Sequence, residues 1–205
     1  VDAGATYGAA GSLLLDPAYL NIGLAEASLI SRVLRTGTST TLAADIDINV
    51  NAAIDGRGRR SGGGLTLNTG NNININDFIV TNNGVINLLA SVGTVNTVPG
   101  KGVFAGNAPI TVRTGGNLST APMVTSGALS FISTAGSVSL DTPLDAGIGP
   151  VSVDAAQQAH VELHELRLHG GEAREPGVPR AEVVDGDAEA VEAQDREARA
   201  HVVGQ

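Results

Sequence analysis

A cluster of three arginines is the first feature of the sequence that could take part in binding. Arg57, Arg59 and Arg60 stand close together, and no comparable basic group occurs elsewhere in the chain. A guanidinium group is planar and recognises sulfate or phosphate groups through paired hydrogen bonds. The cluster is therefore a candidate surface-binding loop for a charged glycan. A solvated loop without a ligand is the alternative interpretation.

Asp45, Asp47 and Arg113 are candidates for polysaccharide cleavage, because enzymes of that class can hold carboxylates and a basic residue on one outer face. Glycoside hydrolysis needs two carboxyl groups at a defined separation. Asp47, however, lies in an alternating run typical of a strand, and the residues expected beside it are Thr, Asn and Ser. A solvated strand face explains such a carboxylate. We therefore predict no catalytic residues and no enzyme activity.

The histidines are the candidates for metal binding. His160, His164 and His169 lie close together with glutamates among them, but their spacing differs from the two-histidine helix of zinc peptidases. The chain has no cysteine, which excludes thiolate ligands and thiol catalysis. Lys101 is the single lysine and opens no helix, as a phosphate-binding loop would require. We predict no metal site and no cofactor.

Charge and composition narrow the range of partners. The chain of 205 residues carries 12 Lys and Arg against 21 Asp and Glu, a formal net charge of −9, whereas nucleic acid selects basic surfaces. No apolar run reaches the roughly 20 residues of a membrane-spanning helix. We therefore expect neither nucleic-acid binding nor a membrane span. Because only 2% of the residues are aromatic, the core must consist of Val, Ile, Leu and Ala.

The charge is distributed unevenly along the chain. Residues 1–155 hold 7 basic and 10 acidic side chains, whereas residues 156–205 hold 5 and 11, so the second part contributes −6 of the −9. All 14 Asn lie in the first part and all 4 His in the second. We expect residues 156–205 to be an acidic, low-complexity tail, disordered or loosely helical. It is either a natural disordered tail or the product of a shifted or opposite reading frame.

Short alternating runs recur through residues 42–155. They begin at residues 46, 65, 86, 110, 129 and 151, at intervals of 19 to 24 residues. Apolar and polar residues alternate in each run with the period of two that marks a half-buried strand. Several runs are followed by a Gly or Asn and a second short run, as at Gly70 before Ile73. The predicted unit is strand, turn, strand, turn, in about 20 residues.

These runs superpose at one period, which favours a parallel β-helix over a β-sandwich. The first inward column is expected to be Ile46, Leu65, Ile86, Ile110, Leu129 and Val151. Asp47 belongs to the outward column beside it. We predict an all-β parallel β-helix (solenoid) of about six rungs over residues 42–155. Residues 1–41 are expected to supply a strand and one short helix, at residues 25–35, that ends at Gly37.

The Asn-rich stretch from Asn68 to Asn87 has two structural interpretations. Stacked coils can carry ladders of amide side chains that bond to one another. Asn also serves turns, because it tolerates the left-handed backbone conformation. We expect a mixture of the two.

Three stretches carry a likeness to a known family. They are the Leu-Asp-Pro segment at residues 11–17, the Thr-Gly segment and alternating run at residues 36–54, and Gly-Gly-Gly-Leu-Thr-Leu with the Asn repeats at residues 62–76. Together they resemble the haemagglutinin-type repeat region of filamentous haemagglutinin-like adhesins, over residues 8–155. The resemblance implies a right-handed β-helix, two-partner (type V) secretion through a dedicated outer-membrane partner, and adhesion. The family offers no catalytic residues to carry over.

The sequence therefore predicts a piece of the shaft of a secreted or surface-exposed bacterial adhesin. Its partner would be an unidentified glycan or protein on a host or neighbouring cell, contacted through loops such as that of Arg57, Arg59 and Arg60. Two alternatives stay open. One is a polysaccharide-active β-helix enzyme, and the other is a self-associating extracellular matrix protein whose last rung leaves an unpaired edge.

Overall fold

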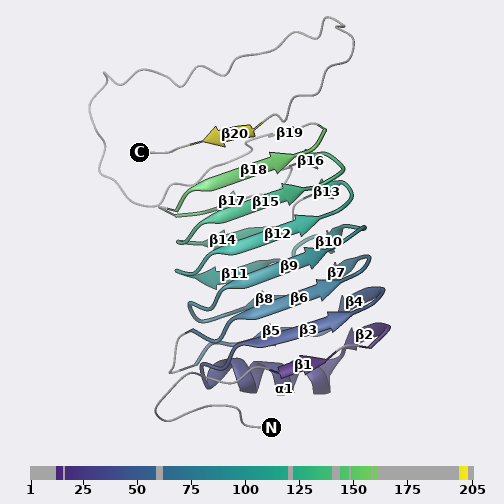
Figure 1. The fold of residues 1–205 in the computed structure, drawn as a ribbon. Coiled ribbons are helices and arrows are strands. Elements are labelled where there is room, and N and C mark those ends of the chain that lie inside the picture. The colour runs from purple at the N-terminus through teal and green to yellow at the C-terminus, as the bar shows by residue number, and fades with distance from the viewer. Residues whose placement is uncertain are drawn as a thin grey trace, which may run out of the picture.

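The chain winds into a stack of parallel coils. The computed structural model describes residues 13–15, 17–58, 62–119, 122–139, 144–147, 149–157, 159–160 and 199–202. Within them the fold is an all-β parallel solenoid of about five turns with one short helix. Strands at the front of Figure 1 run from left to right and those behind return from right to left while the chain climbs, so the winding is right-handed. The predicted fold class is confirmed.

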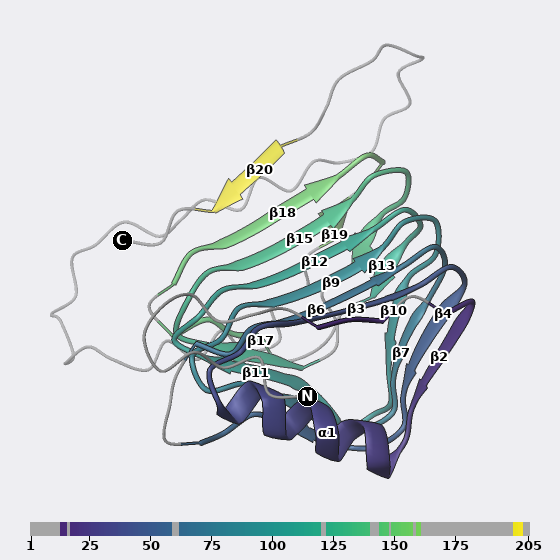
Figure 2. The same ribbon diagram turned by 60° about the horizontal axis from the view of Figure 1, so that its bottom comes forward.

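Each coil contributes strands to three faces, which Figure 2 shows as three sides of the rod. Sheet A contains β1 (Leu13–Leu15), β3 (Thr40–Ala44), β6 (Leu65–Thr69), β9 (Ile86–Ala90), β12 (Ile110–Thr114), β15 (Leu129–Ser133), β18 (Val151–Ala155) and β20 (Arg199–Val202). Sheet B contains β2 (Tyr19–Ile22), β4 (Asp47–Val50), β7 (Ile73–Ile75) and β10 (Val95–Thr97), and sheet D follows above it with β13 (Leu118–Ser119), β16 (Val138–Ser139) and β19 (Ala159–His160). Sheet C contains β5 (Ile54–Asp55), β8 (Ile79–Val80), β11 (Val103–Gly106), β14 (Met123–Thr125) and β17 (Leu144–Asp145).

The register of sheet A confirms most of the predicted inward column and corrects its first member. The aligned partners from the second rung upward are those predicted, Leu65, Ile86, Ile110, Leu129 and Val151. The residue aligned below Leu65 is Thr40 of β3, and Ile46 is not in this column. The run at residues 46–50 contributes instead to β4 of sheet B, where Ile48 is the partner of Ile73. That run alternates more cleanly than residues 40–44, whose first inward side chain is a threonine.

The third strand of each coil was absent from the predicted repeat unit. Strands of sheet C are short, and β5, β8 and β17 have only 2 residues each. A period of two cannot be recognised in so few residues. The repeat is therefore strand, turn, strand, turn, strand, turn. It also begins earlier than residue 42, because β1 pairs with β3 and β2 pairs with β4.

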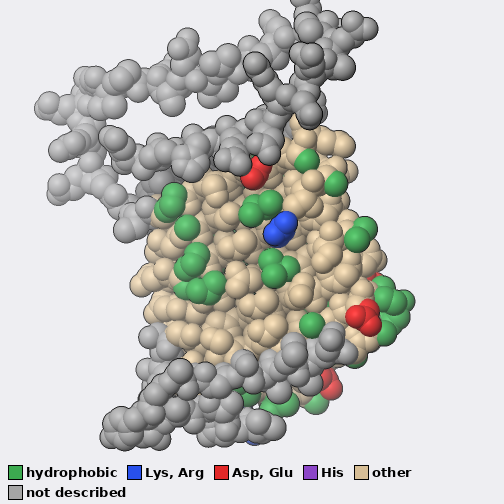
Figure 3. Space-filling view, in the orientation of Figure 1, with side chains coloured by type: hydrophobic (Ala, Val, Ile, Leu, Met, Phe, Trp, Pro, Cys, Tyr) green, Lys and Arg blue, Asp and Glu red, His purple; other side chains and the backbone are tan. Residues whose placement is uncertain are grey.

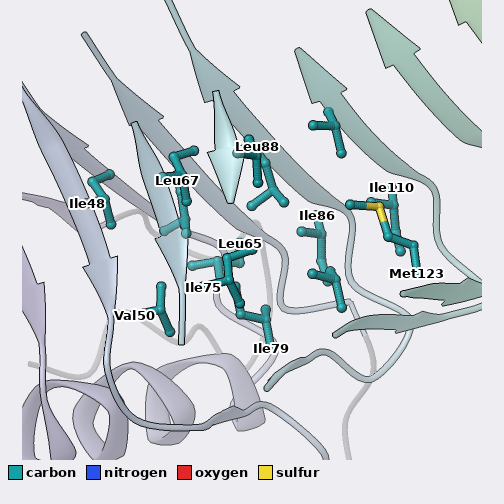
Figure 4. Close-up of a cluster of buried hydrophobic side chains, with 14 of the residues drawn as sticks. Ile48, Val50, Leu65, Leu67, Ile75, Ile79, Ile86, Leu88, Ile110 and Met123 are labelled. Atoms are coloured by element: carbon teal, nitrogen blue, oxygen red, sulfur yellow. The ribbon is translucent and has the colours of Figure 1, made fainter. Parts of the chain in front are cut away.

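The interior of the coils is an aliphatic stack. One fully buried column of sheet A consists of Leu42, Leu67, Leu88, Val112 and Phe131. Figure 4 shows how sheets B and C complete this core, with the labelled side chains of Ile48, Val50, Ile75 and Ile79 pointing towards Leu65, Leu67 and Leu88. Burying one such side chain contributes about 1.5–3 kcal/mol. The same contribution recurs in every coil, as expected of a repeat protein.

The helix α1 (Leu24–Arg35) closes the lower end of sheet C and confirms the helix predicted at residues 25–35. Its buried side chains include Ile30, Val33 and Leu34. The hydroxyl of Ser31 accepts a hydrogen bond of 2.9 Å from the backbone N of Asp55 in β5. The helix thereby covers the edge of β5, which would otherwise offer unpaired backbone groups. It ends before Gly37, whose φ of 84° only glycine adopts readily.

Most of the predicted tail at residues 156–205 lies outside the described residues. The described parts are its first residues, β19, and β20, which pairs antiparallel with β18. The two interpretations of the tail, a natural disordered segment and the product of another reading frame, both stay predictions.

Candidate functional site

The predicted arginine loop is described at Arg57, while Arg59 and Arg60 lie outside the described residues. Arg57 folds back on Asp55. Its Nε and Nη2 donate to Asp55 Oδ1 and Oδ2 at 2.9 and 3.0 Å, and its backbone N donates to Oδ1 at 3.0 Å. The side-chain hydrogen bond from Arg57 lowers the pKa of Asp55 against the opposing effect of burial, and it raises the pKa of Arg57. The guanidinium fork is thus used within the chain.

Arg57 lies at one end of a groove on the outer face of sheet C. The groove has a volume of about 940 Å³. Five strands of the sheet, β5, β8, β11, β14 and β17, each contribute one outward side chain to its floor. In register from the lowest coil upward these are Asp55, Val80, Phe104, Val124 and Asp145. The middle of the floor is therefore apolar, with a carboxylate at each end.

An aromatic pair lies within this groove. The rings of Phe78 and Phe104 have centroids 6.0 Å apart and are tilted by 51°. The Nζ of Lys101 is 4.5 Å from the centroid of the Phe78 ring and donates a hydrogen bond of 2.8 Å to Asp77 Oδ1. That hydrogen bond lowers the pKa of Asp77 below its ordinary value. The chain has only 3 Phe, so two of them meet on one outer face.

One wall of the groove is polar. The side chains that follow successive strands of sheet C are Arg57, Asn82, Asn107 and Ser126. Asn107 and Ser126 are exposed. The turn that carries Asn107 is fixed by the coil below, where Asn83 Oδ1 accepts a hydrogen bond of 2.8 Å from the backbone N of Asn107. The apolar floor and the polar wall give the groove two chemically different sides.

Asp45, Asp47 and Arg113, the candidates for polysaccharide cleavage, do not form one cluster. Asp47 begins β4 in sheet B, and its Oδ1 accepts hydrogen bonds from the side chain and backbone of the turn above, at 3.1 Å from Asn71 Nδ2 and 2.9 Å from Asn72 N. Arg113 lies in β12 on sheet A. Asp47 therefore serves a turn. The prediction that the protein is not an enzyme stays a prediction.

The metal candidates are largely outside the described residues. His160 ends β19, while His164 and His169 are not described. Among the described residues no three His, Asp or Glu side chains lie close enough together to hold a metal ion. The part of the chain that the structure describes also contains no helix with the length and hydropathy of a membrane span.

The asparagines confirm the expected mixture of ladders and turns. On sheet B, Nδ2 of Asn49, Asn74 and Asn96 each donates to the Oδ1 of the Asn one coil below, at 2.8 Å, and the ladder begins at Asn21. In the turns, Oδ1 of Asn72 accepts a hydrogen bond of 3.0 Å from the backbone N of Thr94 in the next coil. Both arrangements hold one coil on the next and leave these amides with a structural role.

Little in the sequence points to the groove. Its floor comes from five coils, and no two floor residues are neighbours in the chain. The available signal was that Phe78 and Phe104 stand about one coil apart in a sequence almost free of aromatic residues.

A comparison of the chain with protein-family models, with curated proteins and with solved structures finds no match. The class that the structure itself defines is a parallel β-solenoid with a β-helix repeat region.

Proposed function

We propose that the chain is part of the shaft of a secreted or surface-exposed bacterial adhesin that mediates attachment. The observation that carries this proposal is the unbroken, in-register stacking of sheet A from β3 to β18. Backbone hydrogen bonds run along the rod from coil to coil, as from Leu65 N to Val85 O and from Ile110 N to Ala128 O. A rod built this way is stiff and can hold binding surfaces away from a cell.

The construction of the rod also suits export as an extended chain. Each coil contacts mainly its neighbours, so folding can begin at one coil and propagate along the rod. The chain has no cysteine, so no disulfide has to form before a coil is complete. We include in the proposal passage through a dedicated outer-membrane partner and a location outside the cell.

Attachment in this proposal depends on outward side chains. Inward positions are occupied by aliphatic residues that the stacking needs, whereas outward positions are free to vary. A glycan or protein on a host or neighbouring cell would contact these outward side chains. The proposal contains no catalytic step.

Microspheres coated with the full chain provide a test. We expect them to adhere to cultured host cells or to neighbouring bacteria more than microspheres coated with an unrelated β-solenoid of similar charge. Adhesion no greater than that of this control would contradict the proposal. Release of new reducing ends from a polysaccharide would point to an enzyme, and end-to-end multimers in sedimentation would point to a matrix protein.

A further inference from the structure

We propose that the groove on sheet C binds an extended, neutral glycan chain that lies along the axis of the rod. This inference rests on the proposed attachment function and assigns to it a site and a class of ligand. Three properties of the groove carry it: the apolar floor, the polar wall and its charged groups.

The floor fits the flat faces of sugar rings. A pyranose ring presents C–H groups on its faces and hydroxyl groups around its edge. Phe78 and Phe104 offer aromatic surface in the groove, and Val80 and Val124 extend the apolar surface below and above Phe104. Binding sites of this kind are mostly apolar with a few well-placed polar groups. The floor would stack against the ring faces and leave the hydroxyl groups to the side.

The wall fits the hydroxyl edges. Asn107 and Ser126 come from successive coils and are exposed on one side of the groove. Arg57 and Asn82 line the same side, where Arg57 holds Asp55 and Asn82 Nδ2 donates to Gly58 O at 2.9 Å. Neighbouring coils are about 4.8 Å apart, a distance comparable to the length of one sugar unit in an extended chain. Successive units over Val80, Phe104 and Val124 would therefore each meet an apolar floor and a polar wall.

The charges of the groove favour a neutral ligand. Asp55 is held by Arg57 and lies 3.7 Å from Arg35 Nη2, and Asp77 is paired with Lys101 at 2.8 Å. Of these groups Asp55 and Arg57 line the groove, together with Asp145, so its described lining has two carboxylates and one cation. Among the described residues a sulfated or uronic chain would find no excess positive charge in this groove, which distinguishes the site from the charged-glycan loop expected from the arginine cluster.

An extended peptide fits the groove less well. Peptides that join a sheet bind at an edge, where backbone groups are unpaired. The groove lies on the face of sheet C, whose backbone groups are used between coils, as from Ile79 N to Gly102 O and from Val103 N to Pro122 O. A ligand there would therefore meet mainly side chains.

Titration calorimetry of the full chain with cellohexaose, maltohexaose and chitohexaose tests the inference, with a heparin hexasaccharide as the acidic comparison. We expect at least one neutral hexasaccharide to bind. Phe104→Ala should weaken that binding about tenfold, because an aromatic contact of this kind is worth about 1 kcal/mol or more. Asn107→Ala should weaken it less, Phe104→Trp should retain it, and Thr111→Ala on the outer face of sheet A should leave it unchanged.

Each contrary result has a distinct meaning. Absence of binding to all three neutral sugars, a preference for the heparin fragment or for an extended apolar peptide, or equal binding by wild type and Phe104→Ala would overturn the glycan groove. If the coated microspheres still adhere to cells in that case, the attachment function survives without this site. If they do not adhere, the proposed function itself fails.

Discussion

Sheets A and C belong to the same coils but present different outer faces. Inward, both supply buried aliphatic side chains, such as Leu88 in sheet A and Ile79 in sheet C. Outward, one column of sheet A consists of small or amide residues, Thr41, Thr66, Asn87, Thr111, Ser130 and Ser152. The second outward column of sheet A also carries apolar and charged residues, among them Leu89, Arg113 and Ile132, and Figure 3 shows this face as mostly polar with separate apolar patches. The outward column of sheet C has Val80, Phe104 and Val124 at its centre.

The comparison separates what builds the rod from what the rod can display. Both sheets stack in parallel although these outward columns differ, with small or amide residues in sheet A and Val80, Phe104 and Val124 at the centre of sheet C. Stacking is therefore determined by inward side chains and by turns, and the outward positions can carry recognition without disturbing it. Four predictions test this distinction between stacking and display. They concern positions at which the expected effect on stability decreases from one prediction to the next.

The largest effect is expected in the turns that join the sheets. A Cβ added at Gly115 would lie 2.2 Å from the backbone O of Ser91 in the coil below, whereas one added at the adjacent Gly116 would lie 3.3 Å from Gly93 O. Gly115→Ala should lower the free energy of unfolding by about 3 kcal/mol or more, because backbone must move, and Gly116→Ala by about 1 kcal/mol or less. Urea unfolding measures both, and equal losses would show that turn contacts do not set the stacking.

The second effect is expected in the interior. Leu88 is completely buried in sheet A, and Leu88→Ala should cost about 2–5 kcal/mol through lost contacts and the cavity left behind. Thr111→Ala, outward on the same sheet, should change stability by about 0.5 kcal/mol or less. The same urea experiment checks both variants. Comparable losses would remove the distinction between inward and outward positions.

A smaller effect is expected in the amide ladder of sheet B. Asn74 takes part in two of its bonds, donating to Asn49 and accepting from Asn96, while Asn96 takes part in one, each at 2.8 Å. Asn74→Ala should cost about 1–2 kcal/mol and Asn96→Ala about half as much, because each net hydrogen bond is worth about 1 kcal/mol. Thermal unfolding measures both losses. If Asn74→Ala and Asn96→Ala lose the same stability, the ladder does not act as a series of independent bonds.

The smallest effect is expected at the charged rim of sheet C. Hydrogen bonds from Arg57 and Lys101 lower the folded-state pKa of Asp55 and Asp77 below the ordinary value of 3.8. The stabilisation that these carboxylates give the folded state is fully present at neutral pH. As pH falls through 3.8 the unfolded chain takes up protons first, so this stabilisation decreases and is lost once pH falls below the folded-state pKa. Asp77→Asn should reduce the loss of stability between pH 5 and about pH 3. An unchanged pH profile would mean that the Lys101 pair contributes nothing to stability.

The sequence was sufficient for the fold because the strands of sheet A are long enough to show a period. From Leu65 to Val151 the predicted inward residues are aligned partners in the structure. The lowest rung was predicted at Ile46 because its run alternates well, whereas β3 begins with the buried Thr40. Pairing with the coil above, which a single run does not encode, decided between the two segments.

The candidate site could not be predicted in the same way. Its floor is a column of single residues from strands as short as 2 residues, and their alignment depends on turn lengths that differ from coil to coil. The sequence showed the basic character of Arg57 but not that Asp55, two residues earlier, takes up its guanidinium group. Side chains that meet across coils become visible only when the register is known.

The most direct test of the separation between interior and outer face compares one variant of the outer face with one of the interior. Phe104→Ala changes the floor of the groove, and Ile86→Val removes one methyl group from the interior at a cost of about 0.5–1.5 kcal/mol. Adhesion of coated microspheres is measured for both, with urea unfolding of the same preparations. We expect adhesion to be markedly weaker in Phe104→Ala than in the wild type and unchanged in Ile86→Val. Equal adhesion of the two variants would contradict the assignment of attachment to the outer face of sheet C.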